Sequence, residues 1–348
     1  MRADADFETT PASFTDGRGR RRFAFVTFLM LQDSYLPGAL VLAHSLRRQG
    51  SQADLVCLVT SDISSGARKT LEQVFDVVIP VEGHYFPSAF TDGRPATSFM
   101  FTKLHALRLG SDGDLGRHYD GVVLLDADVL SRSHYDHLFT LPTPAGVLNE
   151  HKAHLVEPSD RRTPPTDRPM SEQTMSDPAE LVRWKWHDAY DAICPHGHPI
   201  PAAITDRVKS DPTNMGISGA LFVWRPDFAE YQQILAVLRA PDAVASVHKR
   251  YPWPDMQFLT GYWSGRWHNV DARFASLNGY PHVDAVFGIH FGGIKPWSIR
   301  HKSFLHYARF PDFRLWHAAY LDMVDSHPRL TSDVRLDRLA KHLASLRT

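Results

Sequence analysis

Apolar runs alternate with helical patterns over the first third of the chain. Residues 23–31 (FAFVTFLML) form a continuous apolar run rich in aromatic and β-branched residues, which predicts a strand buried on both faces. Residues 36–49 have apolar side chains at helical spacing and end just before Gly50, so we expect a helix there. The same patterns predict strands at 54–60, 76–81 and 121–125 and helices at 64–75 and 102–109. This alternation with short connections predicts a parallel sheet covered by helices.

The pattern is less regular beyond residue 150. Residues 150–213 are rich in Pro, Asp, Arg and His, which predicts an insertion or lid on the acceptor side rather than a core element. Regularity returns with a strand at 219–224, helices at 227–238 and 254–263, and a short strand at 288–291. The predicted organisation is therefore a disordered tail (1–22), a single domain (23–325) and a C-terminal amphipathic helix (326–348).

Composition excludes several classes of protein. The 348 residues are 43% hydrophobic and 22% charged with a net charge of −1, so no basic field favours nucleic acid. Two cysteines do not make a disulfide scaffold. The polar first residues do not fit a signal peptide, and no apolar run is long enough to span a bilayer. We expect a soluble, cytoplasmic protein.

Two carboxylates follow the predicted strand 121–125. Asp126 and Asp128 lie where side-chain alternation places both on one side of the chain, with Ala127 opposite. Carboxylates this close repel each other unless a cation joins them, and their oxygens suit magnesium or manganese. Such a pair fits either a metal site or a turn with solvated aspartates. Ligands of parallel sheets bind at the carboxyl ends of the strands, which favours the metal site.

A second motif, IHFGGIKPW, spans residues 289–297. His290 ends a short apolar strand, and a neutral imidazole is a suitable third ligand for manganese. The following Gly-Gly pair lets the backbone approach a ligand closely, and Lys295 suits a diphosphate. Alone, the motif equally describes a core histidine beside a turn. In contrast, CPHGHP (194–199) has one cysteine and lacks the second pair that a closed zinc site needs.

Together, these motifs resemble glycosyltransferase family 8, which includes glycogenin and galactinol synthase. Further segments agree in order between about residues 23 and 300: FVTFL…DSYLPGALVLAHSLRR, RPATSFMFTKLH, LLDADVL, LFVWRPDFAEY and PDMQFLTGYW. The resemblance implies an α/β fold of GT-A type, a Rossmann-like nucleotide-binding fold with a mostly parallel central sheet flanked by helices. It also implies manganese-dependent, retaining transfer of a hexose from a UDP-sugar, UDP-glucose or UDP-galactose first, to a hydroxyl of a sugar, cyclitol or other small polyol.

The resemblance further implies a role for each matched position. Asp126, Asp128 and His290 would bind Mn²⁺, with Mg²⁺ as the alternative ion. The residues implied in catalysis are Asp255, Gln257 and Lys103. Those implied in holding the donor are Phe28, Leu29, Tyr35, Arg94, Lys103, Asp126, Ala127, Asp128, Asn214, Ser218, Gly219, Gly293 and Lys295. Tyr35 would stack with the nucleoside, and Lys295 would hold the diphosphate.

Two positions depart from the family pattern. Met256 stands where the family usually has glutamine, so Gln257 is only a candidate for that residue's role. The family's N-[SA]-G reads Ser218-Gly219-Ala220 here, and Asn214 lies four residues earlier, so either Asn214 or Ser218 would contact the sugar hydroxyls.

Three alternatives stay open at this point: transfer to a protein or glucan as in glycogenin, a nucleotidyltransferase on a similar sheet, and a sugar- or nucleotide-binding module without catalysis. The expected partners are a UDP-sugar and a hydroxyl-bearing acceptor, with a homodimer as the expected assembly and neither nucleic acid nor membrane.

Overall fold

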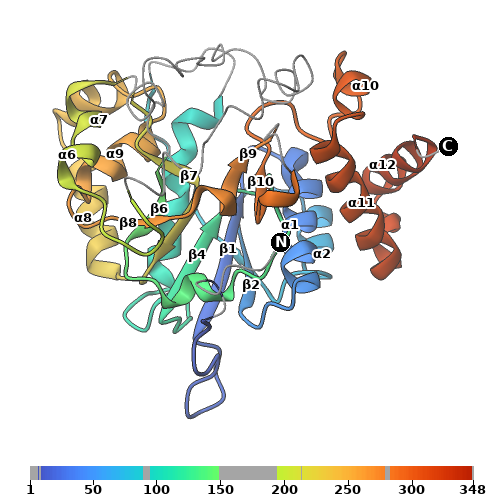
Figure 1. Ribbon diagram of the computed structural model, residues 1–348, viewed down its shortest axis with the longest axis horizontal. Coiled ribbons are helices and arrows are strands. Elements are labelled where there is room, and N and C mark those ends of the chain that lie inside the picture. The colour runs from blue at the N-terminus through green and yellow to red at the C-terminus, as the bar shows by residue number, and fades with distance from the viewer. Residues whose placement is uncertain are drawn as a thin grey trace.

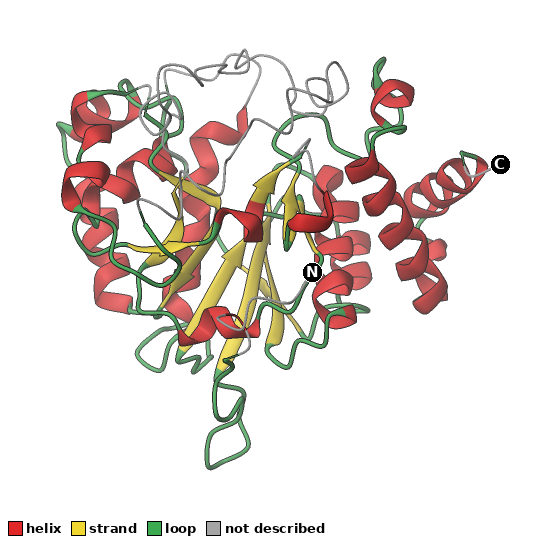
Figure 2. Ribbon diagram, viewed as in Figure 1, coloured by secondary structure: helices red, strands yellow, loops and turns green. Residues whose placement is uncertain are grey.

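A mixed seven-stranded sheet runs through the middle of the molecule, with helices on both of its sides (Figures 1 and 2). The computed structural model describes residue 7 and residues 9–88, 95–148, 194–212, 214–278 and 283–346. The strand order is β3-β2-β1-β4-β7-β6-β8, and a second, three-stranded sheet has the order β5-β10-β9. These ten strands are β1 (Phe23–Leu29), β2 (Asp54–Val59), β3 (Val77–Pro80), β4 (Gly121–Leu125), β5 (Val129–Ser131), β6 (Ala145–Leu148), β7 (Ile217–Trp224), β8 (His268–Val270), β9 (Ser276–Leu277) and β10 (Gly288–His290).

Helices of three kinds connect the strands. The α-helices are α1 (Leu36–Arg48), α2 (Ser65–Leu71), α6 (Ala202–Thr205), α7 (Arg207–Ser210), α8 (Phe228–Arg239), α9 (Pro254–Tyr262), α10 (Phe304–Tyr307), α11 (Pro311–Ser326) and α12 (Val334–Ser345). The 3₁₀ helices are η2 (Asp33–Tyr35), η3 (Pro95–Leu109), η4 (Asp136–Thr140), η8 (Ala272–Ala275), η9 (Val283–Ala285) and η10 (Pro328–Ser332), and η7 (Val244–His248) is a π-helix. Side-chain caps begin several of them: Ser64 accepts a hydrogen bond from Ala67 N in α2, and Asp227 accepts one from Glu230 N in α8.

The prediction of an α/β fold with a mostly parallel sheet is confirmed. Strand β1 is parallel to both β2 and β4, and β2 is parallel to β3. One strand is reversed: β7 lies antiparallel between β4 and β6. The carboxyl ends of the parallel strands lie at one edge of the sheet. Several predicted site residues lie at these strand ends or directly after them in the sequence.

Strand β1 shows why the central strands are apolar throughout. Phe25 and Leu29 face a core that also contains residues of α1, α11 and α12, whereas Val26 and Phe28 face a second core with residues of η3, α8 and α9. All seven residues of β1 are buried. Burial on both faces requires a continuous apolar run instead of an alternating one. Figure 1 shows α1 and α11 on one side of the sheet and α8 and α9 on the other.

Some elements differ from those that the sequence predicts. The helix α11 and the strands β5, β6, β8 and β9 were not predicted, and the helix predicted at 102–109 is a 3₁₀ helix that starts at Pro95. Residues 9–22, which the composition assigns to a tail, include a turn in which Thr15 pairs with Arg21 and Phe14 packs against Phe23. The division of the chain into a tail, a domain and a C-terminal helix stays a prediction.

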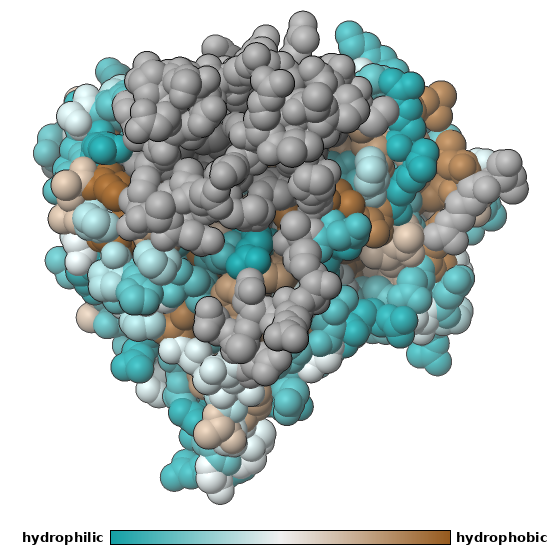
Figure 3. Space-filling model, viewed as in Figure 1, coloured by the Kyte–Doolittle hydropathy of each residue, from teal (hydrophilic) through white to brown (hydrophobic). Residues whose placement is uncertain are grey.

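The surface of the described part mixes polar and apolar residues. Figure 3 shows hydrophilic and hydrophobic residues interspersed over one face. The large exposed apolar residues among those described are few and scattered: Tyr85, Val237, Val244, Leu305, Val334 and Leu346. No helix in the described ranges combines the length and the apolar character that a membrane crossing requires.

Candidate functional site

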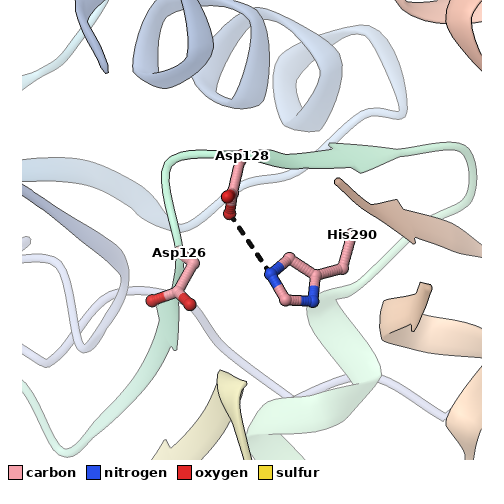
Figure 4. A group of neighbouring side chains, drawn as sticks. All are labelled: Asp126, Asp128 and His290. Atoms are coloured by element: carbon pink, nitrogen blue, oxygen red, sulfur yellow. Dashed lines mark ion pairs between the residues drawn. The ribbon is translucent and has the colours of Figure 1, made fainter. Parts of the chain in front are cut away.

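Three potential metal ligands converge at the carboxyl end of β4. Asp126, Asp128 and His290 each offer one ligand atom, and these atoms all lie within 4.8 Å of one another. Figure 4 shows the Asp128 carboxylate and the His290 ring pointing toward each other, with Asp126 beside them. Asp128 Oδ1 lies 3.4 Å from His290 Nε2. The three residues predicted as metal ligands are therefore neighbours in space.

The pairing of β5 with β10 explains how His290 reaches the two aspartates. β5 begins directly after Asp128 and pairs antiparallel with β10, with His290 opposite Val129. The Phe291 amide then donates to the Asp128 carbonyl at 3.0 Å. Two short strands therefore fix the register of residues that are far apart in the sequence.

The two aspartates of this group differ in their electrostatic surroundings. Burial works to raise the pKa of Asp128, but the Lys295 ammonium and the His290 imidazole outweigh it and hold that pKa below its usual range. Lys295 Nζ lies 2.5 Å from Asp128 Oδ2. For Asp126, burial raises the pKa and the Asp128 charge adds to the effect, while Lys103 opposes it. The pair is therefore asymmetric, as expected for two carboxylates that share one site.

A buried ion pair lies next to the metal ligands. Lys103 is fully buried, and its Nζ lies 2.6 Å from Asp255 Oδ2 and 3.7 Å from Asp126 Oδ1. The same ammonium donates to the Gly219 carbonyl at 3.2 Å. Burial works to lower the pKa of Lys103, but the carboxylates of Asp126 and Asp255 outweigh it and raise that pKa. Lys103 is therefore a fixed cation between the metal ligands and Asp255.

The donor set fits a divalent cation. Within the described ranges, the buried oxygens Asp126 Oδ1 and Asp128 Oδ1 have no hydrogen-bond partner. Buried polar atoms are normally hydrogen-bonded, and these two oxygens have ion-pair contacts instead, with Lys103 Nζ at 3.7 Å and His290 Nε2 at 3.4 Å. Oxygen and imidazole ligands together suit manganese or magnesium. The group could thus hold such an ion.

An aromatic wall closes one side of the site. Tyr35 and Trp297 meet edge to face with ring centroids 5.5 Å apart, and Lys295 Nζ lies 5.6 Å from the centroid of the Tyr35 ring. The Trp297 indole donates to the Ser34 carbonyl at 2.8 Å. At Gly38 in α1, an added Cβ would lie 2.4 Å from the Ala127 carbonyl oxygen and 2.5 Å from Trp297. The absence of a side chain at Gly38 therefore allows α1, the aspartate turn and Trp297 to pack together.

Other predicted residues lie at varying places around this centre. The ring of Phe28 lies 5.7 Å from Lys103 Nζ, while Leu29 is buried in the core. Gly293 is exposed, with open space where a Cβ would be. Arg94 lies outside the described residues, as does most of the predicted lid, 150–213.

Gln257, predicted in catalysis, and Asn214 and Ser218, predicted to hold the donor, mainly contact backbone. Gln257 is fully buried and donates to the Pro212 and Asn214 carbonyls, both at 2.7 Å. The side chain of Asn214 accepts from the Gly216 amide at 3.0 Å, and that of Ser218 accepts from the Ala220 amide at 3.3 Å. These contacts position the loop before β7. The catalytic role of Gln257 and the sugar contacts of Asn214 and Ser218 stay predictions.

Two residues of the site were not identified from the sequence. The sequence does indicate the close packing at Gly38, because a glycine inside an apolar helical pattern is typical of a close approach between backbone segments. Trp297 ends the motif 289–297 without a predicted role, yet it contacts Tyr35 and lies where a Cβ at Gly38 would be.

Comparison of sequences finds two kinds of relative. The uncharacterized protein R707 of Acanthamoeba polyphaga mimivirus is 23% identical over 286 residues, which cover 79% of this chain and 83% of that protein. Glycogenin-1 of Caenorhabditis elegans is 40% identical over 124 residues, 34% of this chain and 27% of that protein. Human glycogenin-2 is 42% identical over 134 residues, 37% of this chain and 25% of that protein. The similarity thus spans about a quarter of the length of these two glycogenins, and no protein-family model matches the chain.

Comparison of structures decides the fold. The galactosyltransferase LgtC, solved with donor and acceptor sugar analogs, matches with a TM-score of 0.51 over 85% of this chain and 94% of that one, at 14% identity. The chain has the GT-A glycosyltransferase fold. The predicted resemblance to the glycogenin group of glycosyltransferases is confirmed as well, over a third of the chain. In this GT-A protein, the aspartate pair of β4 lies where the sheet places ligands, at the carboxyl ends of its parallel strands.

Proposed function

We propose that this GT-A protein transfers a hexosyl group from a UDP-sugar to a hydroxyl acceptor, with manganese as cofactor and with retention at the anomeric carbon. The observation that carries the proposal is the group Asp126, Asp128 and His290 with Lys295 against it, at the ligand-binding edge of a glycosyltransferase sheet. The similarity to glycogenins and to a galactosyltransferase supports a glucosyl or galactosyl donor.

The metal ligands and Lys295 serve the leaving group. Asp126, Asp128 and His290 would hold the ion, which when bound offsets the negative charge that develops on the departing diphosphate. Lys295 lies beside Asp128, so its ammonium is placed to pair with the same diphosphate. Tyr35 and Trp297 form the wall that would exclude water from this side of the donor.

Lys103 and Asp255 serve the sugar end. Asp255 is 2% exposed and lies 2.6 Å from Lys103 Nζ, so its carboxylate has a fixed orientation. A fixed negative charge there would stabilise an oxocarbenium-like sugar in the transition state. Two retaining routes follow from this arrangement: front-face substitution, and double displacement through a covalent bond to Asp255. A trapped glycosyl-Asp255 adduct would establish the second.

A donor screen tests the proposed function. The full chain is incubated with UDP-glucose, UDP-galactose, UDP-N-acetylglucosamine and UDP-xylose, with Mn²⁺ or with EDTA, and released UDP is measured with and without polyols and oligosaccharides. We expect UDP release from a UDP-hexose with Mn²⁺ only, increased by an acceptor. If no UDP-sugar is bound or hydrolysed in the presence of Mn²⁺, the proposal is wrong. Product analysis then separates a small-polyol acceptor from a glucan or protein acceptor.

A further inference from the structure

Lys295 is already engaged with the metal-ligand group in this structure. Its Nζ lies 2.5 Å from Asp128 Oδ2 and also donates to the Phe291 carbonyl. The side chain of Lys295 is 16% exposed and that of Asp128 is 7% exposed, so this contact is not a solvent-screened surface pair. The cation expected to hold the diphosphate of the donor therefore also neutralises a predicted metal ligand.

The charges around the site are close to balance without any metal. Asp126, Asp128 and Asp255 contribute three negative charges, and the two ammonium groups of Lys103 and Lys295 contribute two positive ones. A bare divalent ion bound by Asp128 would lie close to the Lys295 ammonium, and two cations this close repel each other.

A metal ion together with a UDP-sugar behaves differently. Each of the two donor phosphates carries one negative charge, so the complex with a divalent ion is neutral overall. Its entry leaves the charge of the cluster unchanged and gives Lys295 a second anion to contact. The complex therefore adds no net charge to the cluster, whereas the bare ion adds two positive charges beside the Lys295 ammonium.

We propose that Lys295 is an internal counter-ion that weakens binding of the bare metal ion, so that metal and diphosphate enter the site as a coupled pair. This inference rests on the proposed function, because it concerns how that same site is loaded. The proposal has an unexpected consequence for the affinity for metal. Removal of Lys295 should strengthen metal binding in the absence of donor, although it removes a residue of the proposed donor site.

Direct titration tests the sign. Mn²⁺ binding to the full chain is measured without nucleotide, by electron paramagnetic resonance of the free ion and by the Mn²⁺-induced shift in Tm. The proteins compared are the wild type, Lys295→Met and Lys302→Met, in which an exposed lysine of the same segment loses the same charge. We expect Lys295→Met to bind bare Mn²⁺ about tenfold more tightly than the wild type, as loss of a nearby cation predicts, and Lys302→Met to match the wild type. UDP should increase the Mn²⁺ affinity of Lys295→Met less than that of the wild type.

A second variant, Lys295→Gln, keeps the test valid if Lys295→Met does not fold. Lys295→Met leaves Asp128 without its buried cation, which can destabilise the protein. Lys295→Gln removes the charge but keeps hydrogen-bond donors for Asp128 and the Phe291 carbonyl, so it should show the same change in Mn²⁺ affinity.

Two results are distinguished by this design. Bare Mn²⁺ affinity in Lys295→Gln and Lys295→Met that is equal to or below the wild-type value would overturn the counter-ion proposal and leave Mn²⁺-dependent UDP binding intact. A wild-type protein that binds neither Mn²⁺ nor UDP would overturn the proposed function itself.

Discussion

Lys103 and Asp255 form an ion pair inside the protein, with 2.6 Å between Nζ and Oδ2 and almost no exposure of either side chain. One partner comes from η3 and the other from the first turn of α9, so the pair ties together two elements on the same side of the sheet. The cost of removing two charges from water is offset only while both partners are present. This pair therefore couples the stability of the fold to the sugar end of the site.

The first prediction concerns this coupling. Lys103→Met alone leaves Asp255 buried without its cation and should lower the free energy of unfolding by about 3–5 kcal/mol. The double variant Lys103→Met/Asp255→Leu removes both charges and should be more stable than the sum of the single changes allows. Urea denaturation of the four proteins measures this difference. If the effects of the two single substitutions are additive, with no coupling energy, Lys103 and Asp255 do not stabilise the protein as an ion pair.

The second prediction concerns the packing of α1 on the aspartate turn. Gly38→Ala introduces a methyl group 2.4 Å from the Ala127 carbonyl oxygen and 2.5 Å from Trp297, so both must move. We expect a loss of stability of about 1–3 kcal/mol and weaker Mn²⁺-dependent UDP binding.

Gly66 of α2 offers a matched control, because an added Cβ there meets only the Ser64 hydroxyl at 3.8 Å. Gly66→Ala should increase stability by about 0.5–1 kcal/mol and leave UDP binding unchanged. Equal effects of the two substitutions on thermal denaturation and UDP titration would argue against close packing at Gly38.

The third prediction concerns acid stability. His84 and His105 are buried with ring centroids 4.2 Å apart in the wall of a cavity of about 1040 Å³ that is also lined by Arg108, Tyr231 and Arg239. Burial and the nearby positive groups lower the pKa of His84 to about 3, and burial chiefly lowers that of His105 to about 4. Both lie below the unfolded value of 6.5, so below pH 6.5 the unfolded chain binds more protons than the folded one.

Their stabilising contribution is therefore complete above pH 6.5 and is lost as the pH falls toward 4. Each group changes the free energy of unfolding by up to about 1.4 kcal/mol per pH unit in this window. His105→Gln can still donate to the Glu82 carbonyl and accept from Arg108, which are hydrogen bonds that His105 makes, so it should fold and show a shallower pH dependence. His118→Gln, at an exposed position, is the control. Urea titrations at pH 7.5, 6 and 5 that give parallel curves for both variants would contradict this explanation.

The sequence was sufficient to predict the strands β1 to β4 and β7 and to select the three residues that could hold a metal ion. Strands such as β1 and β4 are continuous apolar runs, because both of their faces are buried, and Asp126 and Asp128 stand out where such a run ends. The sequence did not show which of these residues lie close together in space. His290 reaches Asp128 because β10, predicted as a short strand, pairs with β5, which has three residues and is too short to show a periodic pattern. That pairing follows from the tertiary fold.

The same limit applies to the charges. A lysine in the segment FTKLH is ordinarily a solvated helix residue, and nothing local indicates that Lys103 is fully buried against Asp255. The contact between Lys295 and Asp128 joins residues 167 positions apart. The sequence likewise does not show that the amide group of Gln257 donates to the Pro212 and Asn214 carbonyls, and the catalytic role of Gln257 stays a prediction.

The central claim is that Asp128 holds a metal ion against the diphosphate of a UDP-sugar. Isothermal titration of UDP into the full chain, with Mn²⁺ and with EDTA, tests it on the wild type, on Asp128→Ala and on Asp325→Ala, which changes an exposed aspartate of α11. The account predicts Mn²⁺-dependent UDP binding by the wild type and by Asp325→Ala, and none by Asp128→Ala, with circular dichroism spectra that are the same for all three. UDP binding by Asp128→Ala that equals the wild type in affinity and in Mn²⁺ dependence would contradict it.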